Sequence, residues 1–164
     1  MGLDNSVLGK EYRLSKGILA IGLLTTPFFA AMGVFGVLVS VLDDSSPHPV
    51  AAALLFGCFW GSWTVLGLWV ILAYLRERVI VGSGCFQIVD CFQTRTADVA
   101  AISRAIWKSR PNGGMLLMFT RVGKMKIYFG NYEPTDRAEL IRYFRRTVPA
   151  DRQENWTAFE SSSA

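Results

Sequence analysis

Two long segments without a charged side chain constrain this sequence more than any other feature. Residues 17–42 and residues 47–75 contain no Asp, Glu, Lys or Arg, and they are 26 and 29 residues long. A helix needs about 20 mostly apolar residues to cross a bilayer, and only a helix satisfies its own backbone hydrogen bonds in lipid. The sequence therefore predicts a hairpin of two transmembrane helices over residues 17–75, with a short hinge at residues 43–48.

Positive charges flank the outer ends of this predicted hairpin and are missing from its hinge. The hinge carries two aspartates, whereas the flanking cations are Lys10, Arg13 and Lys16 on one side and Arg76 and Arg78 on the other. The positive-inside rule then places both termini in the cytoplasm and the hinge outside, as in a multi-pass protein of the cytoplasmic (inner) membrane. A cleaved signal peptide is the competing interpretation, but the first segment is longer than a signal peptide's apolar region.

The part of the chain after the hairpin is basic. Residues 76–148 contain thirteen Lys and Arg against six Asp and Glu, a net charge of +7, whereas the whole chain carries only +4. Each Lys or Arg near an anionic membrane surface contributes about 1 kcal/mol of attraction. We expect Arg110, Arg121, Lys124 and Lys126 to contact anionic lipid headgroups or an acidic protein. The alternative is a solvated basic surface that satisfies the positive-inside rule and binds nothing.

Residues 76–148 also change from long helical segments to short, β-branched segments separated by glycine. This pattern predicts a small α+β module of antiparallel strands, either a barrel or a bent sheet, capped by a C-terminal helix. Residues 124–129 alternate, which predicts a strand with Met125, Ile127 and Phe129 on its buried face. The other predicted strands are residues 77–81, 85–89, 94–96, 102–108 and 115–120.

The final helix is predicted to start near Asp136, which forms a capping-box pattern with Glu139, and to end before Pro149. Its buried stripe is predicted to be Leu140, Ile141, Phe144 and Val148. We expect residues 1–16 to be a short polar lead and residues 149–164 to be a polar, disordered tail, in which Trp156 and Phe159 are the two side chains able to dock.

A G-x-x-x-G pattern in the second apolar segment predicts a helix-packing site. Gly57 and Gly61 lie one helical turn apart, which allows a neighbouring helix to approach closely. Because the motif is common by chance in glycine-rich membrane helices, we expect the partner to be the first helix of the hairpin. The alternative is a helix from a second copy of the chain, which would make a homo-oligomer.

Three stretches of the chain resemble a known family. They are "RERVIVGSGCFQIVDCFQTRTADVAAI", "GGMLLMFTRVGKMKIYF" and "YEPTDRAELIRYFRRTVP", and they follow a membrane hairpin. Together they resemble the bacterial membrane-anchored pleckstrin-homology-like (PH-like) proteins, in particular the YcxB-like group. Asp98 and Ile102 match an Asp-x-x-x-Ile stretch of that group, and Ala97 stands where a tryptophan is frequent. The resemblance implies a non-enzymatic domain at the membrane, and it supplies no catalytic residues.

The sequence shows no arrangement typical of an enzyme or of a cofactor site. The only histidine, His48, lies in the hinge, and the three cysteines (58, 85 and 91) form no C-x-x-C pair, so we expect no metal and no cofactor. The acidic residues Asp90, Asp98 and Glu133 are scattered along the chain. We do not expect nucleic-acid binding, because a membrane tether explains the basic residues more simply. Two hypotheses remain: a membrane-side binding or scaffolding module, and a small subunit of a larger membrane complex assembled through its hairpin.

Overall fold

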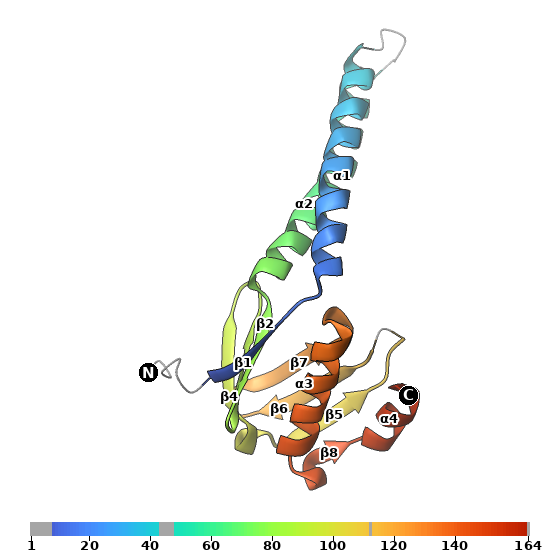
Figure 1. Ribbon diagram of the computed structural model, residues 1–164. Helices are drawn as coiled ribbons and strands as arrows, with labels where there is room; N and C mark the ends of the chain where they lie inside the picture. Colours follow the sequence, from blue (N-terminus) through green and yellow to red (C-terminus); the bar gives the residue numbers. More distant parts are fainter. Residues whose placement is uncertain (1–7, 43–47, 112, 164) are drawn as a thin grey trace. The chain divides into compact units, whose positions relative to one another are not determined.

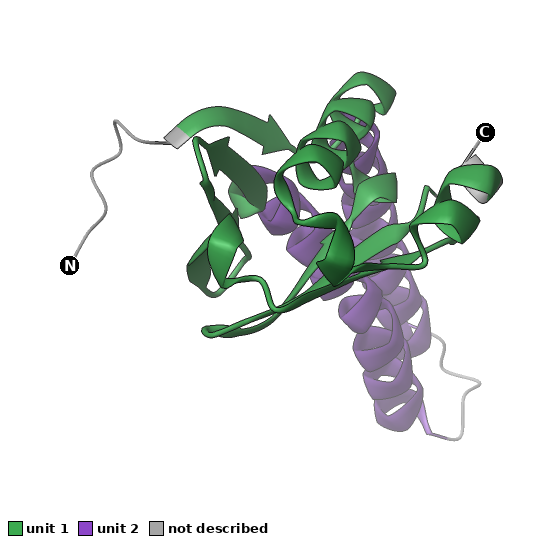
Figure 2. Ribbon diagram, turned by 90° about the horizontal axis from the view of Figure 1, so that it is seen from below, with its two compact units in different colours: residues 1–15, 76–164 green, residues 16–75 purple. Residues whose placement is uncertain are grey.

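The computed structural model of the chain describes residues 8–42, 48–111 and 113–163. The chain forms two compact units, which Figure 2 colours separately. One unit combines residues 1–15 with residues 76–164, and the other is the segment between them, residues 16–75. Both ends of the chain therefore belong to the same unit. Residues 43–47 of the predicted hinge lie outside the described residues.

The unit of residues 16–75 consists of two long apolar helices, α1 (Lys16–Leu42) and α2 (Pro49–Arg76), drawn in blue and green in Figure 1. By length and composition both helices could span a membrane. A long apolar helix in the core of a soluble protein would be mostly buried, whereas most large side chains of these two helices are exposed. Apolar surface of this extent is unfavourable in water, which is consistent with a lipid environment.

Small residues allow α1 and α2 to approach each other closely. A side chain at Gly22 would place its Cβ 2.8 Å from Ile71, and one at Gly36 would place its Cβ 2.7 Å from Phe56. Neither neighbour leaves room for a methyl group. The buried residues of the two helices are Gly22, Gly36, Ser40, Gly67 and Ala73, as expected where backbones pack against each other in lipid.

The other unit contains two four-stranded sheets. The first has the order β1-β2-β3-β4 and is antiparallel throughout, and the second has the order β7-β6-β5-β8, in which only β8 runs parallel to its neighbour. No ladder joins the sheets within the described residues, so the described strands form two sheets and not the closed barrel that was one of the two predicted forms. The strands are β1 (Leu8–Arg13), β2 (Arg78–Gly82), β3 (Cys85–Val89), β4 (Thr94–Asp98), β5 (Arg104–Lys108), β6 (Met115–Thr120), β7 (Gly123–Tyr128) and β8 (Gln153–Glu154).

Strand β1 corrects the expectation that residues 1–16 are only a polar lead. It pairs antiparallel with β2, so that Arg13 lies opposite Arg78. Its pattern is hard to recognise in the sequence because three of its six residues are charged. Burial of Tyr12 and of Leu14, just beyond the strand, attaches this segment to the module.

Helix α3 (Pro134–Thr147) supplies one wall of the module's core. Its predicted stripe is confirmed at Leu140, Phe144 and Val148, which are buried, whereas Ile141 is only half-buried. The ring of Phe144 meets that of Phe86 edge to face at 5.4 Å. The predicted capping box is wrong. The helix begins two residues before Asp136 because Pro134 suits its first turn, and Glu139 accepts hydrogen bonds from Lys10 and Tyr12 instead.

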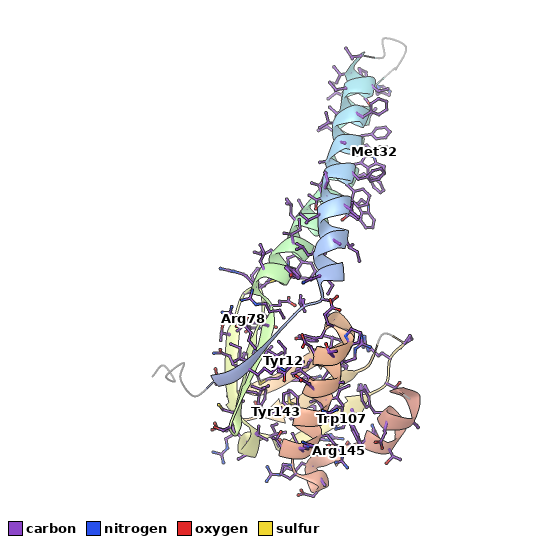
Figure 3. All side chains as sticks on the ribbon, viewed as in Figure 1. Tyr12, Met32, Arg78, Trp107, Tyr143 and Arg145 are labelled. Carbon is purple, nitrogen blue, oxygen red and sulfur yellow. The ribbon has the colours of Figure 1, made fainter. Side chains whose placement is uncertain are left out.

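The tail is ordered, contrary to expectation, over the described residues 149–163. The tail consists of the short helix η4 (Ala150–Arg152), strand β8 and helix α4 (Trp156–Ser163). Two other short helices, η2 (Val99–Ala101) and η3 (Phe129–Asn131), lie earlier in the chain. Trp156 and Phe159 pack their rings 4.9 Å and 5.1 Å from that of Trp107, which Figure 3 labels. Trp107 is a large buried ring on β5 that needs cover, and the tail provides it.

Candidate functional site

Three of the four predicted contact residues share the outer side of the second sheet. Lys124 and Lys126 lie on β7 with exposed side chains, and Tyr128 follows them on the same face. The guanidinium of Arg110 lies over the Tyr128 ring, 5.6 Å from its centre, which brings Arg110 into the same row. Arg121 lies in the turn that precedes β7. The predicted alternation of β7 is confirmed by the burial of Met125, Ile127 and Phe129.

These four cations lack acidic partners. None of them forms an ion pair with another described residue, whereas Lys10, Arg13, Arg78 and Arg104 do. The Lys124 ammonium lies over the Phe119 ring, 5.8 Å from its centre, in a cation–π contact that leaves its charge without a counter-ion among the described residues. The row formed by Arg110, Lys124 and Lys126, which we call the β7 basic row, is therefore available to an anionic partner.

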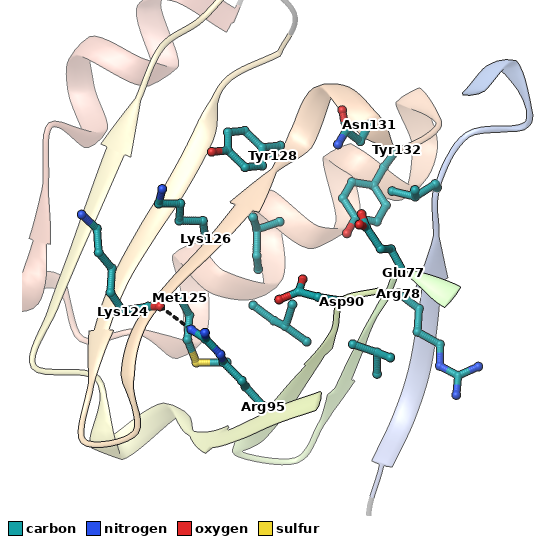
Figure 4. A pocket seen from close by; sticks show the side chains of 14 residues that line it. Glu77, Arg78, Asp90, Arg95, Lys124, Met125, Lys126, Tyr128, Asn131 and Tyr132 are labelled. Atoms are coloured by element: carbon teal, nitrogen blue, oxygen red, sulfur yellow. Dashed lines mark hydrogen bonds between the residues drawn. The ribbon is translucent and has the colours of Figure 1, made fainter. Parts of the chain in front are cut away.

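A pocket of about 490 Å³ runs along the free edge of β7. Every residue from Lys124 to Tyr128 lines it, as do residues of β2 and β3 and of the turn after β3 (Figure 4). Its volume lies within the range of small-molecule sites, about 300–1,000 Å³. Apolar lining comes from Leu14, Ile88, Val89, Met125 and Ile127, and polar lining from Glu77, Arg78, Asp90, Arg95, Lys124, Lys126, Tyr128, Asn131 and Tyr132.

Charges of opposite sign occupy different ends of this pocket. At one end, Arg95 reaches from β4 to β7 and donates a hydrogen bond from Nη1 to the carbonyl oxygen of Lys124 at 2.9 Å, the dashed line in Figure 4. At the other end, Figure 4 shows Glu77 beside Tyr132, with Asp90 between Glu77 and Arg95. The guanidinium of Arg78 points away from this space, towards Glu11.

The acidic end is partly shielded from water, and its ionisation reflects this. Burial raises the pKa of the Glu77 carboxyl; a hydrogen bond from the Cys91 thiol, 3.4 Å away, opposes the shift, and the charge of Asp90 adds to it. Burial raises the pKa of the Tyr132 hydroxyl, and the charges of Glu77 and Asp90 raise it further. The charge of Asp90 thus raises the pKa of both Glu77 and Tyr132, and both side chains line the same end of the pocket.

Cys91 is not a nucleophile in this setting. Burial raises the pKa of its thiol to about 11, and the hydrogen bond to Glu77 acts in the same direction. The reactive species of cysteine is the thiolate, which such a thiol does not form near neutral pH. Among the described residues, no three His, Cys, Asp or Glu side chains gather closely enough to hold a metal ion.

Gly57 and Gly61, the predicted packing residues, lie on a different surface, that of the helical unit. A Cβ at Gly57 would have Val37 as its nearest neighbour at 3.6 Å, and a Cβ at Gly61 would have no atom within 4 Å. Both glycines line an open apolar groove of about 430 Å³, together with residues such as Gly33 and Val37. The closest contacts between α1 and α2 lie at Gly22, Gly36 and Gly67. The close approach of the two helices therefore does not depend on Gly57 or Gly61.

Sequence reasoning missed the pocket and most of the side chains that give it its character. Arg95, Asp90 and Glu77 come from three segments that only the fold brings together, and in the sequence Asp90 is one of several scattered carboxylates. No local spacing in the sequence connects these residues to Lys124. The one available signal was the alternation of β7, which placed Lys124 and Lys126 on an exposed face.

Comparisons with known proteins do not add to this description, because no family model, no curated protein and no solved structure matches the chain.

Proposed function

We propose that this chain is a non-enzymatic, membrane-anchored PH-like module that binds anionic lipid headgroups or an acidic protein at the cytoplasmic face of a bacterial membrane. The observation that carries the proposal is the β7 basic row, whose cations have no acidic partner among the described residues. The short antiparallel strands β2 to β7 followed by helix α3 support the YcxB-like, PH-like part of the proposal, and β8 and α4 are additions to that pattern.

The pairing of β1 with β2 supports the proposed topology. Strand β1 precedes α1 in the chain and β2 follows α2, yet the two strands lie side by side in one sheet. If α1 and α2 each cross the membrane once, both ends of the hairpin must emerge on the same side. The flanking cations, Lys10, Arg13, Lys16, Arg76 and Arg78, then make that side the cytoplasm.

The lipid version of this proposal is tested by hydrogen exchange on the full chain. A fragment of residues 76–150 would lack β1 and α4, so the whole protein should be reconstituted in nanodiscs of phosphatidylcholine and of phosphatidylcholine mixed with anionic lipid. We expect slower exchange in residues 121–128 with anionic lipid, and we expect the difference to shrink as salt screens the charges.

Variants make this test specific. Lys124→Ala with Lys126→Ala should remove the lipid-dependent protection, whereas Lys108→Ala, which changes an exposed lysine outside the pocket, should keep it. Protection that is equal with neutral and anionic lipid would overturn the lipid version. An acidic protein that co-purifies from native membranes with the wild-type chain, and not with the double variant, would support the partner version.

The second candidate function is that of a small structural subunit that assembles through its hairpin. It is favoured by the groove at Gly57 and Gly61, since neither glycine is needed where α1 meets α2. Gly57→Leu with Gly61→Leu should dissociate an oligomer in mild detergent, and Ala51→Leu, an exposed position of the same helix, is the matched control. An unchanged particle size would argue against this function.

A further inference from the structure

The β7-edge pocket contains unpaired charges of both signs. Among the described residues, neither Glu77 nor Asp90 has a Lys or Arg within ion-pair distance, and neither do Arg95, Lys124 and Lys126. The five side chains nevertheless line one cavity of about 490 Å³. Glu77, Asp90 and Arg95 are partly removed from water. Charged groups in that position are normally paired, so a ligand that carries both signs would suit this pocket.

The two sets of charges are separated within the pocket. Arg95 is held at the Lys124 end by its bond to the Lys124 carbonyl oxygen, and an arginine has five N–H donors, so others remain for a ligand. Lys124 and Lys126 are exposed on flexible four-carbon stems, which lets their ammonium groups reach over the rim. Glu77 lies beside Tyr132, and Asp90 lies between Glu77 and Arg95, as Figure 4 shows.

This layout discriminates between classes of ligand. A ligand with only negative charge would be attracted by Arg95 and repelled by Asp90 and Glu77. A ligand with only positive charge would be attracted by the two carboxylates and repelled by Arg95. With Arg78 directed to Glu11, the pocket has three cations and two carboxylates, a net charge of +1. A phosphate group joined to a primary ammonium complements the sign of the charges on both sides of the pocket, and in its phosphomonoester form it also complements their sum.

We propose that this pocket binds a phosphoethanolamine group, with the phosphate at Arg95, Lys124 and Lys126 and the ammonium at Asp90 and Glu77. Arginine recognises phosphate through paired N–H bonds, and a carboxylate accepts strong, charge-assisted hydrogen bonds from an ammonium. The apolar floor of Ile88, Met125 and Ile127 suits the two methylene groups between them. The inference rests on the proposed function in that both assign β7 to ligand binding, and it names the chemistry of the ligand.

The sequence positions of the pocket residues favour a membrane source for this group. Leu14 lies two residues before α1, and Glu77 directly follows α2. If those helices span the bilayer, Leu14 and Glu77 lie close to the helix ends, because each residue of chain spans at most about 3.6 Å. The same chemistry occurs in a phospholipid headgroup, as a phosphodiester, and in a free metabolite, as a phosphomonoester.

The test is calorimetric titration of the full chain in a mild detergent micelle with four soluble probes: O-phosphoethanolamine, glycerophosphoethanolamine, phosphocholine and inorganic phosphate. We expect the two ethanolamine compounds to bind about tenfold more tightly than phosphate or phosphocholine, because only they donate N–H bonds to the carboxylates. Tighter binding of glycerophosphoethanolamine identifies a lipid source, and tighter binding of O-phosphoethanolamine identifies a soluble one.

Variants separate the two ends of the pocket. Asp90→Asn should abolish the preference for the ethanolamine compounds without weakening phosphate, and Arg95→Ala should weaken every probe. Asp98→Asn, at an exposed aspartate outside the pocket, is the matched control and should change nothing. Circular dichroism establishes that each variant is folded, and the Asp90 side chain has no hydrogen bond to lose among the described residues.

Equal binding of phosphate and the ethanolamine compounds, or an Asp90→Asn variant that keeps the preference, would overturn this inference and leave the β7 basic row as an anion-binding surface. If no probe binds and anionic nanodiscs give no protection of residues 121–128, the proposed function itself is wrong. If no probe binds but that protection is present, only the inference about the pocket is wrong.

Discussion

Replacing Phe159 with alanine tests whether the tail is part of the folded module. Phe159 lies on α4 and is only 2% exposed. Its ring lies 5.1 Å from that of Trp107 and 6.2 Å from that of Phe129. Gly114 faces this ring with a φ of +84°, and a Cβ at Gly114 would collide with it. A disordered tail would make none of these contacts.

The expected loss of stability follows from this burial. Removing a fully buried phenylalanine side chain costs about 3–5 kcal/mol of unfolding free energy when the surroundings cannot collapse. Helix α4 has only eight residues and ends the described chain, so it can detach instead of leaving a cavity. Detachment limits the loss to the docking free energy of the tail, and we expect about 3 kcal/mol, the lower end of the range.

The assay is denaturant titration of the full chain in mild detergent, followed by tryptophan fluorescence. In a background where Trp60, Trp63 and Trp69 of the hairpin are changed to phenylalanine, the signal comes from Trp107 and Trp156. Phe92→Ala is the matched control, because Phe92 is 85% exposed, and it should change the free energy by less than about 0.5 kcal/mol. If Phe159→Ala has an effect as small as the control, the docked tail is refuted.

Three further outcomes are expected. Gly36→Leu should cost the hairpin about 1–3 kcal/mol of stability, because the new side chain overpacks against Phe56. Helical circular dichroism in detergent should then be lost at a lower midpoint temperature, whereas Gly61→Leu should leave that midpoint unchanged. Equal effects of the two substitutions would contradict the packing described. Tyr143→Phe should cost about 1 kcal/mol in the same denaturant assay, since the Tyr143 hydroxyl donates to the carbonyl oxygen of Gly82 at 2.9 Å; no loss would mean that the bond is absent. Burial raises the pKa values of Tyr12 and Tyr143 from 10.0 to about 12, so the stability that their neutral forms contribute should be complete below pH 10 and should be lost as the pH rises towards 12. Ultraviolet absorbance of tyrosinate tests this last point, and full ionisation of all five tyrosines near pH 10 would contradict it.

Elements with strong local patterns could be predicted from the sequence. Strands β3 and β6 have the predicted boundaries, and β7 differs by one residue at each end, because short runs of β-branched and apolar residues between glycines leave few alternatives. The two apolar helices also follow directly from composition and length. In each case the segment itself carries enough information to define its structure.

Elements that depend on distant partners could not be predicted. Strand β1 is polar and becomes a strand because β2, beyond the whole hairpin, offers it an edge. The tail is ordered because Trp107 and Phe129 present an aromatic surface that only the folded module creates. Glu139 has the spacing of a capping box, but Lys10 and Tyr12 compete successfully for its carboxylate.

The candidate site divides in the same way. Lys124 and Lys126 could be placed on an exposed face by alternation alone. The pocket beside them could not, since Glu77, Asp90 and Arg95 enter it from three segments whose proximity is a property of the tertiary structure.

The most direct test of the account is the side of the membrane on which the two ends of the hairpin lie. Ser45→Cys and Ser161→Cys variants should be treated with a membrane-impermeant maleimide on bacterial spheroplasts, before and after lysis. The wild-type chain provides the background, because Cys85 and Cys91 are buried and Cys58 lies within α2. We expect the cysteine at position 45 to react before lysis and the cysteine at position 161 to react only after it. Labelling at position 161 in intact spheroplasts, or at position 45 only after lysis, would contradict the account.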